Sequence, residues 1–318
     1  MRLPRAIALR TMETISPLDT EVRPYGTAAI AEAARLILAG HCVAVATETV
    51  YGLAADATNG AAVAGIYAAK GRPSFNPLIV HVTDLAAAER LAIFDDAARA
   101  LASKYWPGPL TLVLPAQADN GIAALATAGL ASIAIRVPAH PAMQDLLQVC
   151  GKPLAAPSAN ASGSISPTRA AHVLKSLDGR IPLIIDAGPT PAGLESTILA
   201  LTDGTPRLLR PGPIDLGLAA SSGGGIEAPG QLASHYAPSK PLRLGALSAA
   251  QDEWLIGFGS MDCHANLSAD ANLVEAAANL FDLLHQADAS HLPKIAVVPI
   301  PIGGLGAAIN DRLARAAA

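Results

Sequence analysis

Residues whose side chains can do chemistry crowd into one short stretch, AAKGRPSFNPLIVHV at residues 68–82. Lys70 and Arg72 stand two positions apart, Asn76 follows them, and His81 interrupts an apolar run. Two prolines restrict the backbone between these residues and stiffen the loop. A rigid loop with a lysine point charge and a two-pronged arginine suits a polyphosphate. Each residue alone has a plainer reading, since a lysine favours a helix end and a strand histidine usually belongs to the core.

Hydroxyl groups gather in other stretches, each of which adjoins an apolar run. Thr47 and Thr49 lie at the end of one run, where open α/β sheets place ligands. Ser196 and Arg210 lie at the edges of two further runs. Threonine in strands and serine in flexible loops are ordinary, so every stretch alone is a weak signal. Together they describe a cleft for an anionic, hydroxyl-bearing ligand such as a nucleotide. The uncharged stretch LAAPSANASGSISPT adds Ser158, Asn160, Ser162, Ser164, Ser166 and Thr168.

Several common catalytic motifs do not occur in the sequence. It contains no GxxxxGK[ST], no HExxH and no GxSxG, and its eight histidines show no metal-ligand spacing. The stretch GGLGAAI at residues 303–309 is similar to a dinucleotide-binding turn but lacks the third glycine, so a packing turn is favoured.

The elements that must position these residues mix helices and strands without a strict alternation. This pattern predicts an α/β fold with a mixed sheet and covering helices. Helices are expected near 27–39, 60–70, 84–91, 95–105, 140–149 and 168–177, and strands near 41–47, 78–82, 110–114, 132–137, 181–185, 196–201 and 206–210.

The composition changes at residues 217–240, where Gly, Ser, Ala and Pro dominate as in a linker. Beyond it the sequence predicts a small α/β unit with strands at 254–260 and 294–301 and helices at 270–287 and 305–317. We therefore divide the chain into an N-terminal extension, a catalytic domain, a linker and a small Rossmann-like C-terminal domain. Their predicted bounds are 1–25, 26–215, 216–241 and 242–318.

Composition limits the function classes. The 318 residues carry a net charge of −4 and only 3% aromatics, which is unlike a protein that grips DNA or RNA along its whole surface. The three cysteines, Cys42, Cys150 and Cys263, form no CxxC pair, which fits a reducing cytoplasm. Neither a secretory signal nor a membrane span is expected.

Eight motifs in this order resemble the YrdC-like threonylcarbamoyl-AMP synthases, in the two-domain form with an extra C-terminal domain. The resemblance covers roughly residues 26–240 and implies an open twisted α/β sheet around a deep, positively lined cavity. One departure is Ala46, where many members have proline. The motifs are TETVYGL, KGRPSFNPLIVHV, WPGPLTLVL, IAIRVPAHP, APSANASGSISPT, DAGPTPAGLESTI, LRPGPI and APGQLASHYAP.

The resemblance implies a nucleotidyltransferase that makes L-threonylcarbamoyladenylate from L-threonine, bicarbonate or CO2, and ATP, with release of pyrophosphate. The product would serve the formation of N6-threonylcarbamoyladenosine at tRNA position 37, and a separate tRNA threonylcarbamoyl-transferase complex would carry out that transfer. The protein itself would make at most a weak contact with tRNA and would bind neither DNA nor a membrane. Mg2+ would accompany ATP and be held mainly through phosphates rather than by protein ligands.

The same resemblance assigns roles to individual residues. Lys70 and Arg72 would be the catalytic pair on the ATP phosphates, and Arg136 would hold the threonine carboxylate. ATP would also contact Asn76, Ser132, Asn160, Thr168, Arg210, His235 and Tyr236, and threonine would contact Thr47, Thr49, His81, Ser158 and Ser196.

Two other functions compete with this interpretation. An RNA-binding module would use the cavity to grip RNA, but the negative charge and scarce aromatics speak against stacking platforms. A carbamoyl-transfer domain of the hydrogenase-maturation kind would carry zinc-finger and acylphosphatase regions, for which this chain has neither cysteine pairs nor spare length.

Overall fold

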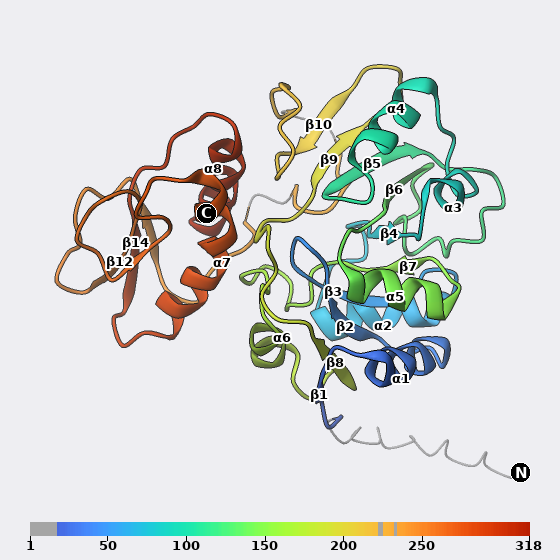
Figure 1. Cartoon of the computed structure of the whole chain (residues 1–318), viewed down its shortest axis with the longest axis horizontal. Coiled ribbons are helices and arrows are strands. Elements are labelled where there is room, and N and C mark those ends of the chain that lie inside the picture. Colours follow the sequence, from blue (N-terminus) through green and yellow to red (C-terminus); the bar gives the residue numbers. More distant parts are fainter. Residues whose placement is uncertain (1–17, 222–224, 232–233) are drawn as a thin grey trace, which may run out of the picture.

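A computed structural model describes residues 18–221, 225–231 and 234–318 and contains two β-sheets with covering helices (Figure 1). The helices are α1 Thr27–Leu38, α2 Gly60–Lys70, α3 Leu85–Glu89, α4 Asp96–Tyr105, α5 Pro141–Cys150, α6 Ala170–Leu177, α7 Leu273–Ala289 and α8 Leu305–Ala316. The strands of the large sheet are β1 Glu21–Pro24, β2 Val43–Ala46, β3 Tyr51–Asp56, β4 Ile79–His81, β5 Leu110–Pro115, β6 Ser132–Arg136, β7 Leu154–Ala155, β8 Leu183–Asp186, β9 Thr197–Ala200 and β10 Arg207–Arg210. The small sheet contains β11 Leu242–Leu244, β12 Glu253–Gly257, β13 Ala265–Asn266 and β14 Lys294–Val297.

The large sheet is mixed, in the order β1-β8-β2-β3-β7-β4-β6-β5-β9-β10. β4 runs parallel to β6 and pairs His81 with Arg136, so two residues from distant parts of the chain end side by side. β5 runs parallel to β9 and brings Thr111 beside Ile198. The predicted α/β class with a mixed sheet is therefore confirmed.

Helices cover both faces of the large sheet. Successive side chains of a strand point to opposite faces, and in this sheet both sets are buried. Val43 and Val45 of β2 pack with α1 and α5, whereas Ala44 and Ala46 face the core that α2, α4 and α6 cover. This is the period of two expected for a strand that is buried on both sides.

The observed elements include a strand at residues 51–56, where the sequence analysis predicted none. This strand is β3, whose backbone pairs with β2 on one side and β7 on the other. The stretch YGLAAD contains small residues with little strand propensity, so pairing with both neighbours decides its conformation. The N-terminal extension predicted at 1–25 contains β1, which is paired in parallel with β8.

The small sheet is entirely parallel, in the order β11-β14-β12-β13, and Figure 1 shows α7 and α8 on the side that faces the large domain. Val50, Ile165 and Leu194 of the large domain join the apolar core of this unit, together with Phe281 of α7. The two units therefore share buried surface.

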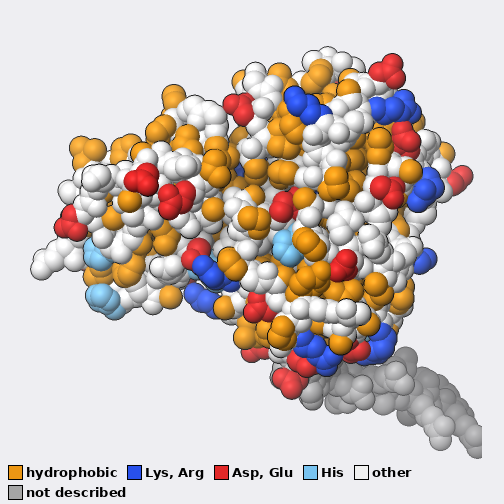
Figure 2. Space-filling model, viewed as in Figure 1, with side chains coloured by type: hydrophobic (Ala, Val, Ile, Leu, Met, Phe, Trp, Pro, Cys, Tyr) orange, Lys and Arg blue, Asp and Glu red, His pale blue; other side chains and the backbone are white. Residues whose placement is uncertain are grey.

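No helix in the described part of the chain is both long and apolar enough to cross a membrane. On the face shown in Figure 2, acidic and basic side chains are interspersed among apolar ones. That face offers no broad surface of one charge.

Candidate functional site

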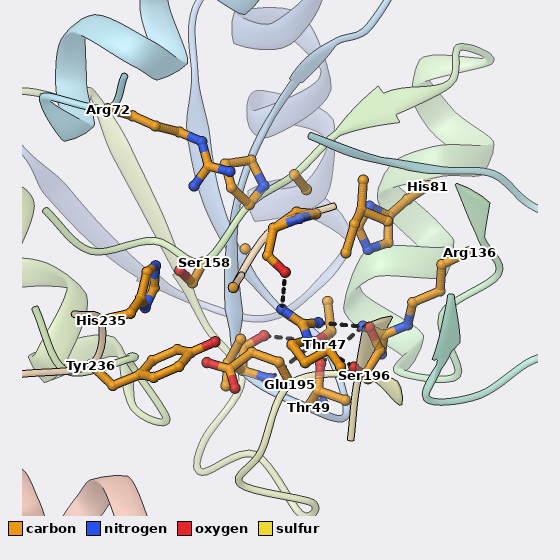
Figure 3. A pocket seen from close by; sticks show the side chains of 18 residues that line it. Thr47, Thr49, Arg72, His81, Arg136, Ser158, Glu195, Ser196, His235 and Tyr236 are labelled. Atoms are coloured by element: carbon orange, nitrogen blue, oxygen red, sulfur yellow. Dashed lines mark hydrogen bonds between the residues drawn. The ribbon is translucent and has the colours of Figure 1, made fainter. Parts of the chain in front are cut away.

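A hollow with about 510 Å³ of empty space, counting its open mouth, lies where strand ends, the serine-rich loop and the linker meet. The structure brings together residues that the sequence analysis assigned to one cleft from widely separated positions (Figure 3). Arg72, His81, Ser158 and Arg210 all line it, so the convergence on which the cleft prediction depends is confirmed. The predicted residues on its wall are Thr47, Thr49, Arg72, His81, Arg136, Ser158, Ser196, Arg210, His235 and Tyr236.

Arg72 reaches the hollow because α2 ends two residues before it. Asn59 caps the start of α2, and Gly71 ends the helix in the left-handed conformation with φ 59°. The Nε and Nη2 atoms of Arg72 donate to the backbone oxygens of Asn76 and Pro77 at 3.2 and 3.0 Å. The loop therefore holds the guanidinium in a fixed orientation toward the hollow (Figure 3).

Lys70 is placed differently from Arg72. The expectation that one loop carries both cations is wrong for Lys70, which is the last residue of α2, and both side chains are buried, with Lys70 2% and Arg72 8% exposed. The Nζ atom of Lys70 donates to the backbone oxygens of Ser158 and Asn160, both at 2.5 Å. Burial and the charge of Arg72 hold the pKa of Lys70 well below its ordinary value. Lys70 thus holds the serine-rich loop in place through these hydrogen bonds.

The end of the hollow opposite Arg72 is built around Arg136 (Figure 3). Its Nε donates to the backbone oxygen of Gly108 at 3.1 Å, and its Nη1 donates to the Thr49 hydroxyl at 3.0 Å. Its Nη2 lies 2.6 Å from a carboxylate oxygen of Glu48. Burial alone would raise the pKa of Glu48, but the charge of Arg136 and hydrogen bonds hold it below its ordinary value.

A third group of residues surrounds Arg210. The Arg210 Nε and Nη2 atoms donate to the backbone oxygen and the hydroxyl of Ser196 at 3.0 and 3.1 Å. The Ser196 hydroxyl also pairs with the Thr111 hydroxyl at 2.7 Å. Glu195, next in the chain, lines the hollow and forms an ion pair with Arg312 of α8.

Several polar atoms in this region are buried and have no hydrogen-bond partner within the described residues. Among them are the Nδ1 atoms of His81 and His235, the hydroxyl of Tyr236 and both side-chain amide atoms of Asn76. Burial lowers the pKa of both histidines to about 3, so the rings are neutral at physiological pH. Since an unsatisfied buried polar group costs about 1–3 kcal/mol, such a group points to a ligand that completes it.

Several predicted ligand contacts lie outside the lining of the hollow. Asn76 is fully buried within the Arg72 loop, and Ser132 begins β6 at the end away from Arg136. Asn160 donates to the backbone oxygens of Ala161 and Ser164, which shapes the serine-rich loop. Thr168 lies beside His172 of α6. Lys70 and Asn76 hold the wall residues Ser158 and Arg72 through hydrogen bonds, and the ligand contacts of these residues stay predictions.

Two functional candidates, Glu48 and Glu195, were missed by the sequence analysis. It searched for cations and hydroxyls, which an anionic ligand requires, and passed over the carboxylates in TETV and LEST. The available signal was a single acidic residue next to hydroxyl-bearing residues and close to a buried strand. Burial of such a carboxylate demands a cationic partner, and here the partners are Arg136 and Arg312.

Replacing Glu48 by glutamine should destabilise the fold by about 2 kcal/mol at about pH 7, because the buried Arg136 loses its counter-charge. The folded-state pKa of Glu48 lies below its ordinary value of 4.5, so its contribution is complete above 4.5 and disappears as pH falls through the folded-state pKa. Urea unfolding at about pH 7 and about pH 3 should show the difference shrinking in acid. Glu89→Gln, which breaks an exposed ion pair with Arg99, is the control. If the difference in free energy of unfolding between Glu48→Gln and the unmodified chain is equal at both pH values, the ion pair between Glu48 and Arg136 is contradicted.

A family model for Sua5, YciO and YrdC, described as telomere recombination, matches residues 35–212. A second model, described as the threonylcarbamoyl-AMP synthase C-terminal domain, matches residues 212–318. The chain is 41% identical to the threonylcarbamoyl-AMP synthase of Bacillus subtilis, over 91% of this chain and 92% of that protein. It is 38% identical to the Pyrococcus abyssi protein of the same name, over 89% and 92%.

Solved structures give the same result. The crystal structure of Pyrococcus abyssi Sua5 complexed with L-threonine matches with a TM-score of 0.84 and 36% identity. The match covers 94% of this chain and 97% of that one, so both domains are included.

Proposed function

Because this chain belongs to the family of Sua5, YciO and YrdC proteins, we propose that it synthesises L-threonylcarbamoyladenylate from L-threonine, bicarbonate or CO2, and ATP, and releases pyrophosphate. Two features support the proposal. Relatives that span most of the chain are threonylcarbamoyl-AMP synthases, and a solved relative was crystallised with L-threonine. The hollow has the charges and hydroxyls that an amino acid and a nucleotide need.

The observation that carries the proposal is the division of the hollow into two ends. Arg72 and Ser158 lie at one end with His235 and Tyr236, whereas His81, Arg136 and Thr49 lie at the other (Figure 3). We assign the first end to ATP, because a rigid arginine fork suits phosphates. We assign the second end to threonine, whose carboxylate would meet Arg136 and whose hydroxyl would meet neutral donors and acceptors.

The reaction needs two bond-forming steps. The threonine amine loses a proton and adds to CO2 to give a carbamate, and a carbamate oxygen then attacks the α-phosphorus of ATP. The bond from that phosphorus to the bridging oxygen breaks, and pyrophosphate leaves with the electron pair. Such a transfer depends on alignment and charge neutralisation more than on a strong base. Arg72 and Arg210 would supply positive charge from two sides of the hollow.

Mg2+ fits the site as a companion of the nucleotide. Within the described ranges, no three His, Cys, Asp or Glu side chains gather in a way that could hold a metal. The carboxylate on the wall, Glu195, is already engaged by Ser166 and Arg312. We therefore assign the ligands of Mg2+ to the phosphates, where the ion would neutralise charge on the leaving group.

The product defines a downstream partner. We propose that threonylcarbamoyladenylate passes to a separate tRNA threonylcarbamoyl-transferase complex, which modifies adenosine 37 of tRNA in the cytoplasm. An acyl adenylate is an activated donor, so a transfer enzyme must consume it.

The proposal is tested by incubating the purified chain with ATP, bicarbonate and isotopically labelled L-threonine. We expect labelled threonylcarbamoyladenylate and an equal amount of pyrophosphate, and neither when threonine or bicarbonate is omitted. Absence of both products, under conditions in which the Bacillus subtilis relative forms them, would refute the function.

The linker carries His235 and Tyr236, which we expect to close over the nucleotide end of the hollow as a latch. A substitution at Gly230, in the same linker, tests this role. Gly230 has φ +86°, and an added Cβ would lie 2.8 Å from the Tyr236 hydroxyl and 2.9 Å from Arg210 Cδ. Gly230→Ala should lower kcat/KM by about tenfold to a hundredfold, because it displaces both side chains. Gly217→Ala is the control, since Gly217 has φ +66° but open space around its Cβ position. Equal activity of the two variants would contradict the latch.

A further inference from the structure

Arg312 of α8 is fully buried, although it belongs to the C-terminal domain and lies 117 residues from its main partner. Its Nε lies 2.7 Å from an oxygen of Glu195, on the wall of the hollow. Its Nη1 lies 2.6 Å from Asp311, and its Nη2 donates to the backbone oxygen of Pro211 at 3.0 Å. All three nitrogens of Arg312 are therefore engaged.

The same guanidinium supports a second wall residue. Its central carbon lies 5.2 Å from the centre of the Tyr236 ring, a distance typical of a cation–π contact. Tyr236 lines the hollow, and Figure 3 shows its ring close to Glu195. One side chain of the C-terminal domain thus contacts two residues that face the ligand space.

Stability alone does not account for a buried pair of this kind. Apolar side chains of similar volume often stabilise a fold as well as a buried ion pair does. The charge at Glu195 matters in another way, because it lies in the same hollow as Arg72 and Arg210. A carboxylate there without a partner would repel phosphates and offset the two arginines.

We propose that Arg312 is a positioning residue of the active site, which neutralises Glu195 and holds it and Tyr236 in place so that the hollow accepts the polyphosphate of the nucleotide. This inference rests on the proposed function for the identity of the ligand. It gives the C-terminal domain a part in ligand binding through these two wall residues, in addition to its packing against the large domain. Burial alone would raise the pKa of Glu195, but Arg312, Arg210 and hydrogen bonds hold it below its ordinary value, which agrees with an ionised, compensated carboxylate.

The test measures binding of inorganic pyrophosphate to the full chain by calorimetry, independently of turnover. Arg312→Met keeps an unbranched stem that reaches about as far as Nε and removes the charge, and it should weaken pyrophosphate binding about tenfold or more. Glu195→Gln should leave binding equal or tighter, because Arg312 then adds positive charge near the hollow. The double variant should regain most of the affinity lost in Arg312→Met. Simple loss of packing would weaken binding in both single variants, so the opposite signs separate charge compensation from structure.

Arg243→Met is the matched control, since it breaks an ion pair with Glu253 in the same domain away from the hollow. It should leave binding unchanged. Equal binding by Arg312→Met and the unmodified chain, weaker binding by Glu195→Gln, or an unmodified chain that binds no pyrophosphate would each overturn the inference. A chain that shows the expected pattern of binding but forms no threonylcarbamoyladenylate would refute the proposed function and leave the role of Arg312 in place. Thermal unfolding of every variant shows whether it is folded at the assay temperature.

Discussion

Arg72→Ala is expected to lower kcat/KM for ATP by about a hundredfold to a thousandfold, the size of effect seen when a preorganised donor to a reacting oxyanion is removed. Arg72 donates to two backbone oxygens of its own loop and presents the rest of its guanidinium to the hollow. Its loss would remove a positive charge and release the loop. The measurement is the initial rate of pyrophosphate release at varied ATP and saturating threonine and bicarbonate.

Two further variants make this result specific. Arg72→Lys should recover only a small part of the activity, because an ammonium cannot reproduce the planar fork that holds two carbonyls and a ligand together. Arg99→Ala removes an exposed arginine paired with Glu89 and should leave the rate unchanged. Near-normal turnover in Arg72→Ala would remove this residue from the proposed phosphate site.

Lys70→Met is expected to damage the fold as well as the activity. The methionine would leave the backbone oxygens of Ser158 and Asn160 buried without their donor, so the free energy of unfolding should fall by about 3 kcal/mol. Turnover should be lost together with the position of Ser158, which lines the hollow. Chemical denaturation and the pyrophosphate assay on the same preparation measure the two effects.

Lys104→Met is the matched control for Lys70→Met, because Lys104 also lies in the last turn of a helix but is exposed. It should change the free energy of unfolding by less than about 0.5 kcal/mol. A fully stable Lys70→Met protein that binds ATP poorly would instead place Lys70 on the phosphates, as the family resemblance first implied.

Much of the site could be predicted from the sequence because each polar residue is adjacent to a recognisable apolar strand. His81 illustrates this, since it belongs to a predicted strand, and the parallel pairing of β4 with β6 places it beside Arg136. The arginine that follows α2 also indicated an anionic ligand. Strand ends and hydroxyl-rich loops thus predicted part of the wall, whereas Arg136, His235 and Tyr236 were assigned only through the family resemblance.

The remaining features depend on tertiary contacts that no local pattern contains. Lys70 has the sequence context of an exposed helix end, and only the serine-rich loop folded onto it makes it buried. The strand β3 has small residues and forms because two neighbours pair with it. Arg312 reads as a surface residue of an amphipathic helix, and its partner Glu195 belongs to the other domain. A single sequence shows none of these pairings.

The separation between Glu195 and Arg312 also bears on how the protein is made. A ribosome releases the chain from its N-terminus, so Glu195 emerges 117 residues before the side chain that neutralises it. During that interval Glu195 lacks its ion-pair partner, and Tyr236, which emerges earlier than α8, lacks the guanidinium that its ring contacts. The hollow is therefore complete only after α8 has been synthesised, and we expect a polypeptide stalled before α8 to bind nucleotide weakly.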